Sequence, residues 1–249
     1  MQDITGTSSL EVPSSAYDLQ IDLKPTSAAT RWKPALSQLQ YQQYPWPDDT
    51  LRAVGYSCPK EVNPLRQYTS DYNATSKSSP SLDSYVNAFV PTGQTYHDIG
   101  LIWGARLLAP DGIYSATNAD AVAPGGYQVS RHIVFMTDGQ LDTDGKLADA
   151  WGVNAIMNRV QADNAVAPPS ASEARIYASH LRRTQIICNE MKKRGFIIWI
   201  VGFGNQGLSQ ELKECATDPD HWSIATDTAA LRQSFAKIAQ TIGGLRLSS

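Results

Sequence analysis

Residues 131–137 (RHIVFMT) and residues 196–201 (FIIWIV) are short, continuous apolar runs. Such runs are typical of strands that are buried on both faces of a parallel sheet. Between them, residues 174–194 form an amphipathic pattern whose apolar side chains recur at helical spacing. The side chains expected to face inward there are Tyr177, Leu181, Cys188 and Met191. A strand, a long helix and a second strand predict a right-handed crossover in a parallel sheet.

The same alternation continues on both sides of this unit. Helices are expected over residues 81–89, 96–108, 208–216 and 228–242, and a third strand over residues 221–225. The last helix is expected to place Phe235 inward with its other apolar residues. We therefore predict an α/β fold for residues 81–249, with a doubly wound, mostly parallel sheet flanked by helices.

Residues 1–80 have a different character, because they hold eight of the 14 prolines and lack helical periodicity. We expect an irregular, Pro-rich segment there, either an insertion or the N-terminal part of the same domain. A short strand is expected at residues 17–23. The predicted organisation is thus an irregular segment (1–80) followed by an α/β core (81–249).

Composition excludes several classes of partner. The chain has 249 residues, a net charge of −3 and only 18% charged residues. An acidic isoelectric point of about 5.8 without a basic block argues against nucleic acid and against anionic lipid. The longest apolar run, residues 196–203, is too short to span a bilayer. Residues 1–10 lack a signal-peptide pattern. The chain is therefore expected to be either cytosolic or a piece of a longer exported protein.

The three cysteines, Cys58, Cys188 and Cys215, form no C-x-x-C pair, so a zinc site is not expected. Two alternatives remain open. All three can be buried thiols. Alternatively, Cys188 and Cys215 can form a disulfide, and Cys58 is then left to pair elsewhere. The second alternative requires helices 174–194 and 208–216 to pack side by side.

Ligands of open α/β sheets bind beyond the carboxyl ends of the strands. Asp138 follows the strand at residues 131–137, where its carboxylate can face a cation or can simply begin a turn. Thr95 precedes the helix at residues 96–108, where its hydroxyl can bind a metal or can cap the helix. His97 and Asp98 are expected at the surface or supporting the ligands, not as ligands themselves.

Five stretches together carry a family resemblance: TGQTYHDIGLIWGARLLAP, RHIVFMTDGQLDT, KKRGFIIWIVGFG, LKECA and FAKIAQTIGGLRL. They resemble the C-terminal part of a von Willebrand factor type A domain, more narrowly the one in TadG-like proteins of Flp (tight adherence) pilus assembly. The resemblance implies a metal-ion-dependent adhesion site in which Thr95 and Asp138 bind Mg²⁺ or Mn²⁺. Hydroxyl and carboxylate oxygens suit these ions.

The resemblance also implies a function and a location. It implies a non-enzymatic, extracytoplasmic interaction module that binds a protein of the pilus or the envelope. A carboxylate of that partner completes the coordination of the metal in such domains. Members of the family carry a membrane anchor that this chain lacks.

The chain departs from the family at the D-x-S-x-S loop that supplies the remaining metal ligands. The nearest string, Asp3-Ile4-Thr5-Gly6-Thr7, has threonine in place of both serines. No apolar strand precedes it and no helical pattern follows it. Either this string is a degenerate metal loop, or the first strand and first helix of the domain lie outside this chain. In the second case we expect poor metal affinity.

A competing interpretation comes from Gly202, Gly204 and Gly207, which form a G-x-G-x-x-G pattern followed by Asp227 20 positions later. This pattern is typical of dinucleotide-binding enzymes with a Rossmann-like fold. Too few residues follow it, however, to complete such a unit. Hydrolase and P-loop motifs are absent from the sequence, and we expect the chain not to be an enzyme.

Overall fold

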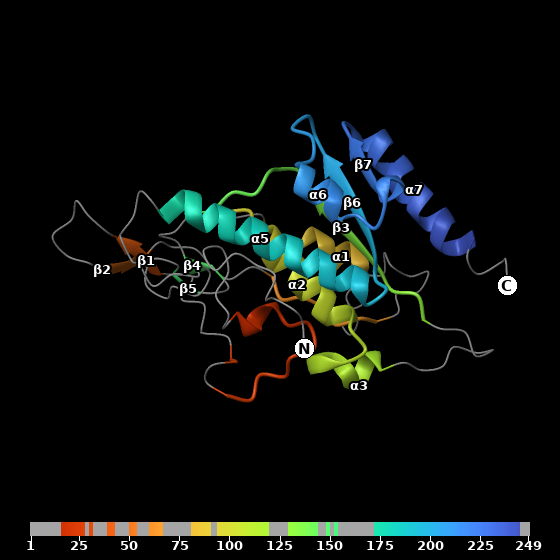
Figure 1. Ribbon diagram of the computed structural model, residues 1–249. Coiled ribbons are helices and arrows are strands. Elements are labelled where there is room, and N and C mark those ends of the chain that lie inside the picture. Colours follow the sequence, from red (N-terminus) through yellow and green to blue (C-terminus); the bar gives the residue numbers. More distant parts are fainter. Residues whose placement is uncertain are drawn as a thin grey trace.

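A parallel sheet organises the fold of this protein, as a computed structural model shows (Figure 1). The structure describes residues 16–27, 30–31, 39–42, 50–53, 60–66, 81–90, 94–119, 129–143, 148–149, 152–153 and 172–244. The strands are β1 (Leu39–Gln42), β2 (Thr50–Ala53), β3 (His132–Thr137), β4 (Ala148–Asp149), β5 (Gly152–Val153), β6 (Ile197–Phe203) and β7 (Trp222–Ala225). The helices are α1 (Leu82–Asn87), α2 (His97–Leu108), α3 (Ser115–Asn118), α5 (Ser172–Lys193), α6 (Gln210–Cys215) and α7 (Thr228–Gly244), with 3₁₀ turns η1 (Tyr17–Leu19), η2 (Gly112–Tyr114) and η3 (Pro219–His221).

The main sheet has the order β3-β6-β7, and both pairs of neighbours are parallel. In register, His132 lies beside Ile197, and Ile200 lies beside Trp222. The other strands form two short antiparallel pairs, β1 with β2 and β4 with β5. The predicted α/β class is therefore confirmed, as are three predicted strands and the helices that follow them.

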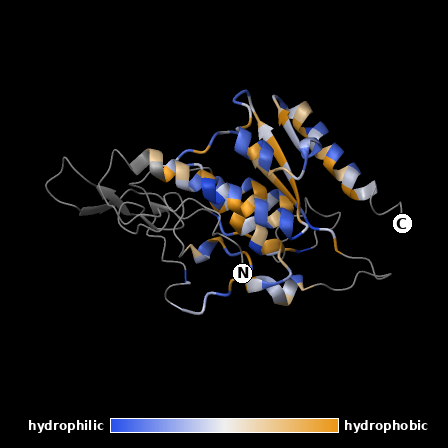
Figure 2. Ribbon diagram, in the orientation of Figure 1, coloured by the Kyte–Doolittle hydropathy of each residue, from blue (hydrophilic) through white to orange (hydrophobic). Residues whose placement is uncertain are grey.

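Helices cover both faces of the sheet. Side chains of β6 alternate between two apolar clusters: Ile198 and Ile200 lie in the larger one, and Trp199 and Val201 in the smaller one. Because successive residues of a strand face opposite sides, the two clusters lie on opposite faces. Helices α2, α5 and α6 pack on the first face and α7 packs on the second. Figure 1 shows α5 and α7 on opposite sides of the sheet, and Figure 2 shows β6 as an apolar layer between them.

The end of α5 shows how the sequence sets the crossover. Gly195 has a φ of 76°, a left-handed conformation that favours glycine. The Gly195 amide donates to the Lys192 carbonyl, and the Phe196 amide donates to the Met191 carbonyl. These two bonds make a Schellman cap, in which buried Met191 and Phe196 supply the accompanying apolar contact. The chain is thereby turned directly from α5 into β6.

A segment that precedes residue 80 also belongs to the core. Ala16, Leu19 and Ile21 are buried in the larger apolar cluster, against residues of α2 and α5. The strand predicted at residues 17–23 is wrong, since a 3₁₀ turn and a second turn, at residues 21–22, occupy this stretch. The turn directs backbone carbonyls at a buried arginine, as described below. The division of the chain at residue 80 stays a prediction.

Four apolar side chains that were expected inside are exposed. On β3, Val134 and Met136 are 38% and 52% exposed, so this strand is not buried on both faces. The reason is that α7 covers only β6 and β7 on that side of the sheet. Tyr177 on α5 and Phe235 on α7 were expected inside and are also exposed. None of the described helices is long and apolar enough to cross a membrane.

The structure joins Cys188 of α5 to Cys215 of α6 in a disulfide, which confirms one of the two cysteine alternatives. Both residues are buried, and the two helices pack side by side as that alternative required. Cys58 lies outside the described residues.

We expect the Cys188→Ala, Cys215→Ala double variant to lose about 3–4 kcal/mol of unfolding free energy, because a loop of this length loses its constraint in the unfolded chain. Urea denaturation of oxidised protein measures this loss. Adding reductant should lower the stability of the parent protein and leave the variant unchanged. Equal stability of the two proteins under oxidising conditions would contradict the prediction.

Candidate functional site at the carboxyl edge of the sheet

The loop after β3 presents Asp138 to solvent. The Thr137 hydroxyl accepts a hydrogen bond from the Gly139 amide at 3.2 Å and donates to the Gly139 carbonyl at 2.9 Å. This local pairing folds the chain back on itself just past the strand. Asp138, between the two residues, is exposed at the carboxyl edge of the sheet. The edge predicted from the sequence is therefore where this carboxylate lies.

Thr95 lies against the same loop. The Thr95 amide donates to the Asp142 carbonyl, and the Asp142 amide donates to the Thr95 carbonyl, both at 3.0 Å. This isolated antiparallel bridge joins the segment before α2 to the loop after β3, although the two are more than 40 positions apart in sequence. Thr95 and Asp138 thus belong to one rim, which we define as residues 95–96 and 138–142.

The alternative role of Thr95 as a helix cap is not observed. The N-cap residue of α2 is Tyr96, and it makes no side-chain capping bond. Within the described residues, neither the Thr95 hydroxyl nor the Asp138 carboxylate makes a hydrogen bond or ion pair. Both oxygen groups are therefore available to a ligand as far as the described part of the chain is concerned.

His97 lies beneath the rim. The side chain is only 4% exposed, and its ring meets that of Phe135 edge to face, with the centroids 5.6 Å apart. Burial lowers the pKa of His97 below its usual 6.5, and this effect outweighs the opposite influences of Asp98 and of a hydrogen bond with the Gly139 backbone. Its Nε2 atom is buried without a hydrogen-bond partner among the described residues. The neutral imidazole thus supports the loop from below.

Asp98 is fully buried, so of the two positions expected for it, at the surface or supporting the ligands, the surface one is wrong. Nδ1 of His180 is 2.9 Å from each carboxylate oxygen, and Nε of Arg183 donates to Oδ2 at 3.0 Å. Burial alone would raise the pKa of Asp98, but the charges and hydrogen bonds of His180 and Arg183 lower it further than burial raises it. The start of α2 is thereby bound to the middle of α5.

The guanidinium of Arg183 extends the network to the N-terminal segment, where it pairs with the Asp18 carboxylate. Asp18 and Asp98 raise the pKa of Arg183 against the effect of its burial. Arg106 of α2 donates to the backbone carbonyls of Asp18 and Gln20 at 3.0 and 2.9 Å. Two buried arginines therefore hold the 3₁₀ turn against α2 and α5.

The sequence did not identify Asp18, His180 and Arg183 as important residues. A signal was present: on α5, polar His180, Arg183 and Thr184 continue the same helical stripe as buried Cys188 and Met191. Polar residues on the inward face of a helix must find buried partners. The sequence gives no way to identify that partner as Asp98 or Asp18, which lie on distant segments.

The oxygen donors of the rim suit a hard divalent cation but do not complete its coordination. Thr95 supplies a hydroxyl and Asp138 a carboxylate, whereas Mg²⁺ takes six oxygen ligands, several of them water. No group of three or more His, Cys, Asp or Glu residues that could hold a metal occurs among the described residues. The string Asp3–Thr5–Thr7 lies outside them. Further ligands must therefore come from water, from other parts of the chain or from a partner.

The glycine-rich loop after β6 has a different geometry from a phosphate cradle. A Cβ atom at Gly202 would lie 2.9 Å from Leu208, so this glycine makes room for a packed side chain. Helix α6 begins at Gln210, three residues after Gly207, and Ser209 is its N-cap. Asp227 accepts a hydrogen bond from the Ala230 amide at 2.8 Å and so caps α7. Gly202, Ser209 and Asp227 thus have structural roles that need no nucleotide.

Comparisons of the chain with protein-family models, with curated proteins and with solved structures give no match. The resemblance to type A domains therefore stays an expectation from sequence motifs. The case for a function rests on the rim and on what its side chains can bind.

We expect Arg183→Met to lower the unfolding free energy by about 3–5 kcal/mol, because it removes the cation shared by two buried carboxylates, Asp98 and Asp18. Urea denaturation measures the change. The matched control is Arg232→Met at an exposed position of α7, for which we expect a change within about 0.5 kcal/mol. Equal effects of the two substitutions would show that the buried network is not stabilising.

We expect His97 to make stability depend on pH. Its pKa in the folded protein is below 6.5, so the unfolded chain binds a proton more readily. The stability that depends on a neutral His97 is fully present above about pH 6.5. It is lost as the pH falls through the pKa of His97 in the folded protein. In urea denaturation, stability should therefore fall less steeply below pH 6.5 for His97→Gln than for the parent. An NMR titration midpoint of His97 at or above 6.5 would contradict this.

Proposed function

We propose that this chain is a non-enzymatic protein-interaction module that binds a partner through the rim formed by Thr95 and Asp138. In this proposal the fold is that of a type A domain resembling the one in TadG-like proteins. The partner is a protein of a pilus or of the cell envelope. It approaches the carboxyl edge of the sheet and contacts the rim with an acidic side chain.

The observation that carries the proposal is the reciprocal backbone pairing of Thr95 with Asp142. It fixes the segment before α2 beside the loop that contains Asp138. A hydroxyl and a carboxylate from distant parts of the sequence therefore share one edge, and neither is engaged by the described residues.

A divalent cation is part of the proposal. Mg²⁺ or Mn²⁺ would be held by the Thr95 hydroxyl and the Asp138 carboxylate, and the ion would supply an electrophilic point for a partner carboxylate. The protein's own task is to keep the two oxygens on one rigid edge. His97 and the Asp98–Arg183 pair do this from beneath, because they hold the loop and the start of α2.

An extracytoplasmic location is consistent with the disulfide between Cys188 and Cys215. Disulfides persist in oxidising compartments and are rare in the cytosol. The bond is buried between two helices of the core, where it stabilises the side of the fold that supports the rim.

Isothermal titration with Mn²⁺ tests this function. We expect the chain to bind Mn²⁺ with a dissociation constant on the order of 1 mM, since it contributes only a hydroxyl and a carboxylate to the ion. Binding should be lost in Asp138→Ala and in Thr95→Ala, while thermal melting stays unchanged because neither side chain is bonded to the described residues.

The matched control is Asp111→Ala. Asp111 is also exposed, but it follows α2 at the opposite edge of the sheet, where the Leu108 carbonyl accepts a hydrogen bond from Arg131. We expect this variant to bind Mn²⁺ as the parent does. Absence of Mn²⁺ binding by the parent, or equal binding by the parent and Asp138→Ala, would refute the metal site.

A further inference from the structure

Strand β7 has an open edge that faces away from the rest of the sheet. The Gly204 amide of the β6 side donates to the Ala225 carbonyl, so the backbone groups of Ala225 point toward β6. Since the N–H and C=O of one residue point the same way and alternate along a strand, those of Ser223 also face β6. The N–H and C=O of Trp222 and Ile224 therefore point outward. Among the described strands, β7 pairs with β6 alone.

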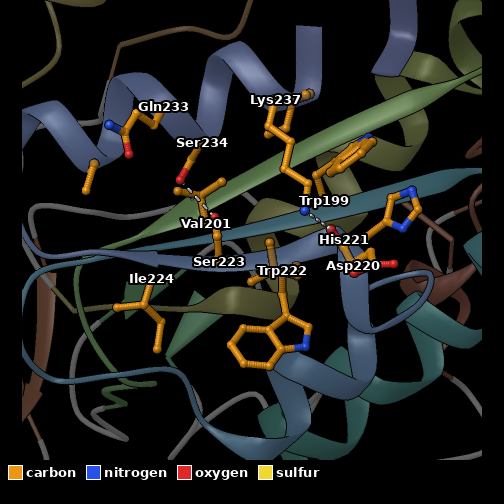
Figure 3. Close-up of a pocket in the computed structure, with 13 residues that line it drawn as sticks. Trp199, Val201, Asp220, His221, Trp222, Ser223, Ile224, Gln233, Ser234 and Lys237 are labelled. Atoms are coloured by element: carbon orange, nitrogen blue, oxygen red, sulfur yellow. Dashed lines mark hydrogen bonds between the residues drawn. The ribbon is translucent and has the colours of Figure 1, made fainter. Parts of the chain in front are cut away.

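A groove of about 240 Å³ runs along this edge, between β7 and α7 (Figure 3). Its floor includes the buried side chains of Trp199, Val201 and Ile238. The Ser223 hydroxyl donates to Ser234 at 3.0 Å and ties the strand to the helix. The groove thus has an apolar floor beside a row of backbone hydrogen-bonding groups.

The two flanks of the edge differ in chemistry. In Figure 3, Trp222 and Ile224 point away from α7, whereas Gln233, Ser234 and Lys237 line the groove from the helix. The first flank is apolar at Ile224, which is 39% exposed, whereas Lys213 Nζ lies 5.1 Å from the centroid of the Trp222 ring. The second flank is polar and contains one cation, Lys237, whose contact is a 3.4 Å hydrogen bond to the Asp220 carbonyl. The Asp220 carboxylate also borders the groove and is exposed.

We propose that the β7 edge binds an extended peptide segment by strand addition. The segment hydrogen-bonds to Trp222 and Ile224 and alternates apolar with polar residues. Its apolar side chains lie beside Trp222 and Ile224, and its polar ones face α7, with a carboxylate toward Lys237. In strand addition, main-chain hydrogen bonds supply affinity and alternate side chains supply specificity. The two flanks of the β7 edge differ in chemistry and can therefore select different side chains on the two faces of the added strand.

A peptide is favoured over a second copy of this chain by charge. Two β7 edges paired about a two-fold axis would bring two α7 helices side by side on one face of a continuous sheet. Helix α7 carries the cations Arg232 and Lys237 and no acidic residue, so two such helices side by side would bring only like charges together. A segment that carries Asp or Glu at that point replaces this repulsion with attraction.

The experiment is amide NMR of the full chain with a defined probe, the capped peptide Thr-Val-Glu-Val-Thr-Val-Ser. We expect hydrogen exchange to slow about tenfold or more at Trp222 and Ile224, because only their amides gain partners. Exchange at Ser223 and Ala225 should stay the same, since both already face β6. A control peptide methylated on the backbone nitrogens of its Glu and the next Val loses a donor on each edge and should not bind.

Variants give an independent readout. Gln233→Trp adds a bulky side chain to the groove from an exposed helix position and should weaken peptide binding about tenfold or more. Gln240→Trp, two turns further along the same side of α7 and outside the groove, should bind as the parent does.

Three outcomes would overturn the proposal. One is unchanged exchange at Trp222 and Ile224 with about 10 mM peptide, enough to occupy about 90% of a site of millimolar affinity. Another is equal binding by Gln233→Trp and the parent. The third is a dimer of the unliganded chain, measured by sedimentation, that Gln233→Trp dissociates, which would assign this edge to a second copy.

Discussion

The arrangement of this fold depends on the ion pairs made by the guanidinium of Arg183. It is fully buried and pairs with Asp98 at the start of α2 and with Asp18 in the N-terminal 3₁₀ turn. A buried cation of this kind is tolerable only where carboxylates compensate for its lost hydration. Because both carboxylates come from segments distant in sequence, satisfying this one charge fixes α5, α2 and the turn relative to one another. Thr95, three residues before Asp98, is placed by the same constraint.

The elements that could be predicted from the sequence are amphipathic helices, which bury one face, and continuously apolar strands. Apolar runs gave the parallel strands β3 and β6, and helical spacing with Gly195 at its end gave α5. What could not be predicted depends on the neighbours of an element. Val134 is apolar and yet exposed, because no described helix covers β3 on that face. A local pattern carries no information about which helix lies over which strand.

The candidate site shows the same division. Topology alone placed Asp138 at the carboxyl edge, because a residue that follows a parallel strand must lie there. The position of Thr95 came from motif resemblance, and the structure adds the pairing with Asp142 that joins the two segments. The buried support from His180 and Arg183 was not predicted, because the position of a polar residue on a helix does not indicate which residue it will pair with. The result is a rim whose two oxygen ligands are not bonded to any described residue, above a buried network of charged side chains. Such a division of roles suits a surface that binds a partner without changing shape.

Paramagnetic NMR with Mn²⁺ tests most directly whether the two segments form one site. A bound Mn²⁺ ion broadens the amide signals of residues within its neighbourhood, irrespective of their positions in the sequence. We expect the amide signals of Thr95 and Gly139 to broaden together, at a lower Mn²⁺ concentration than the amide signals of the acidic turn around Asp218. Broadening of only one of the two, or earlier broadening at Asp218, would contradict a shared site at the carboxyl edge of the sheet.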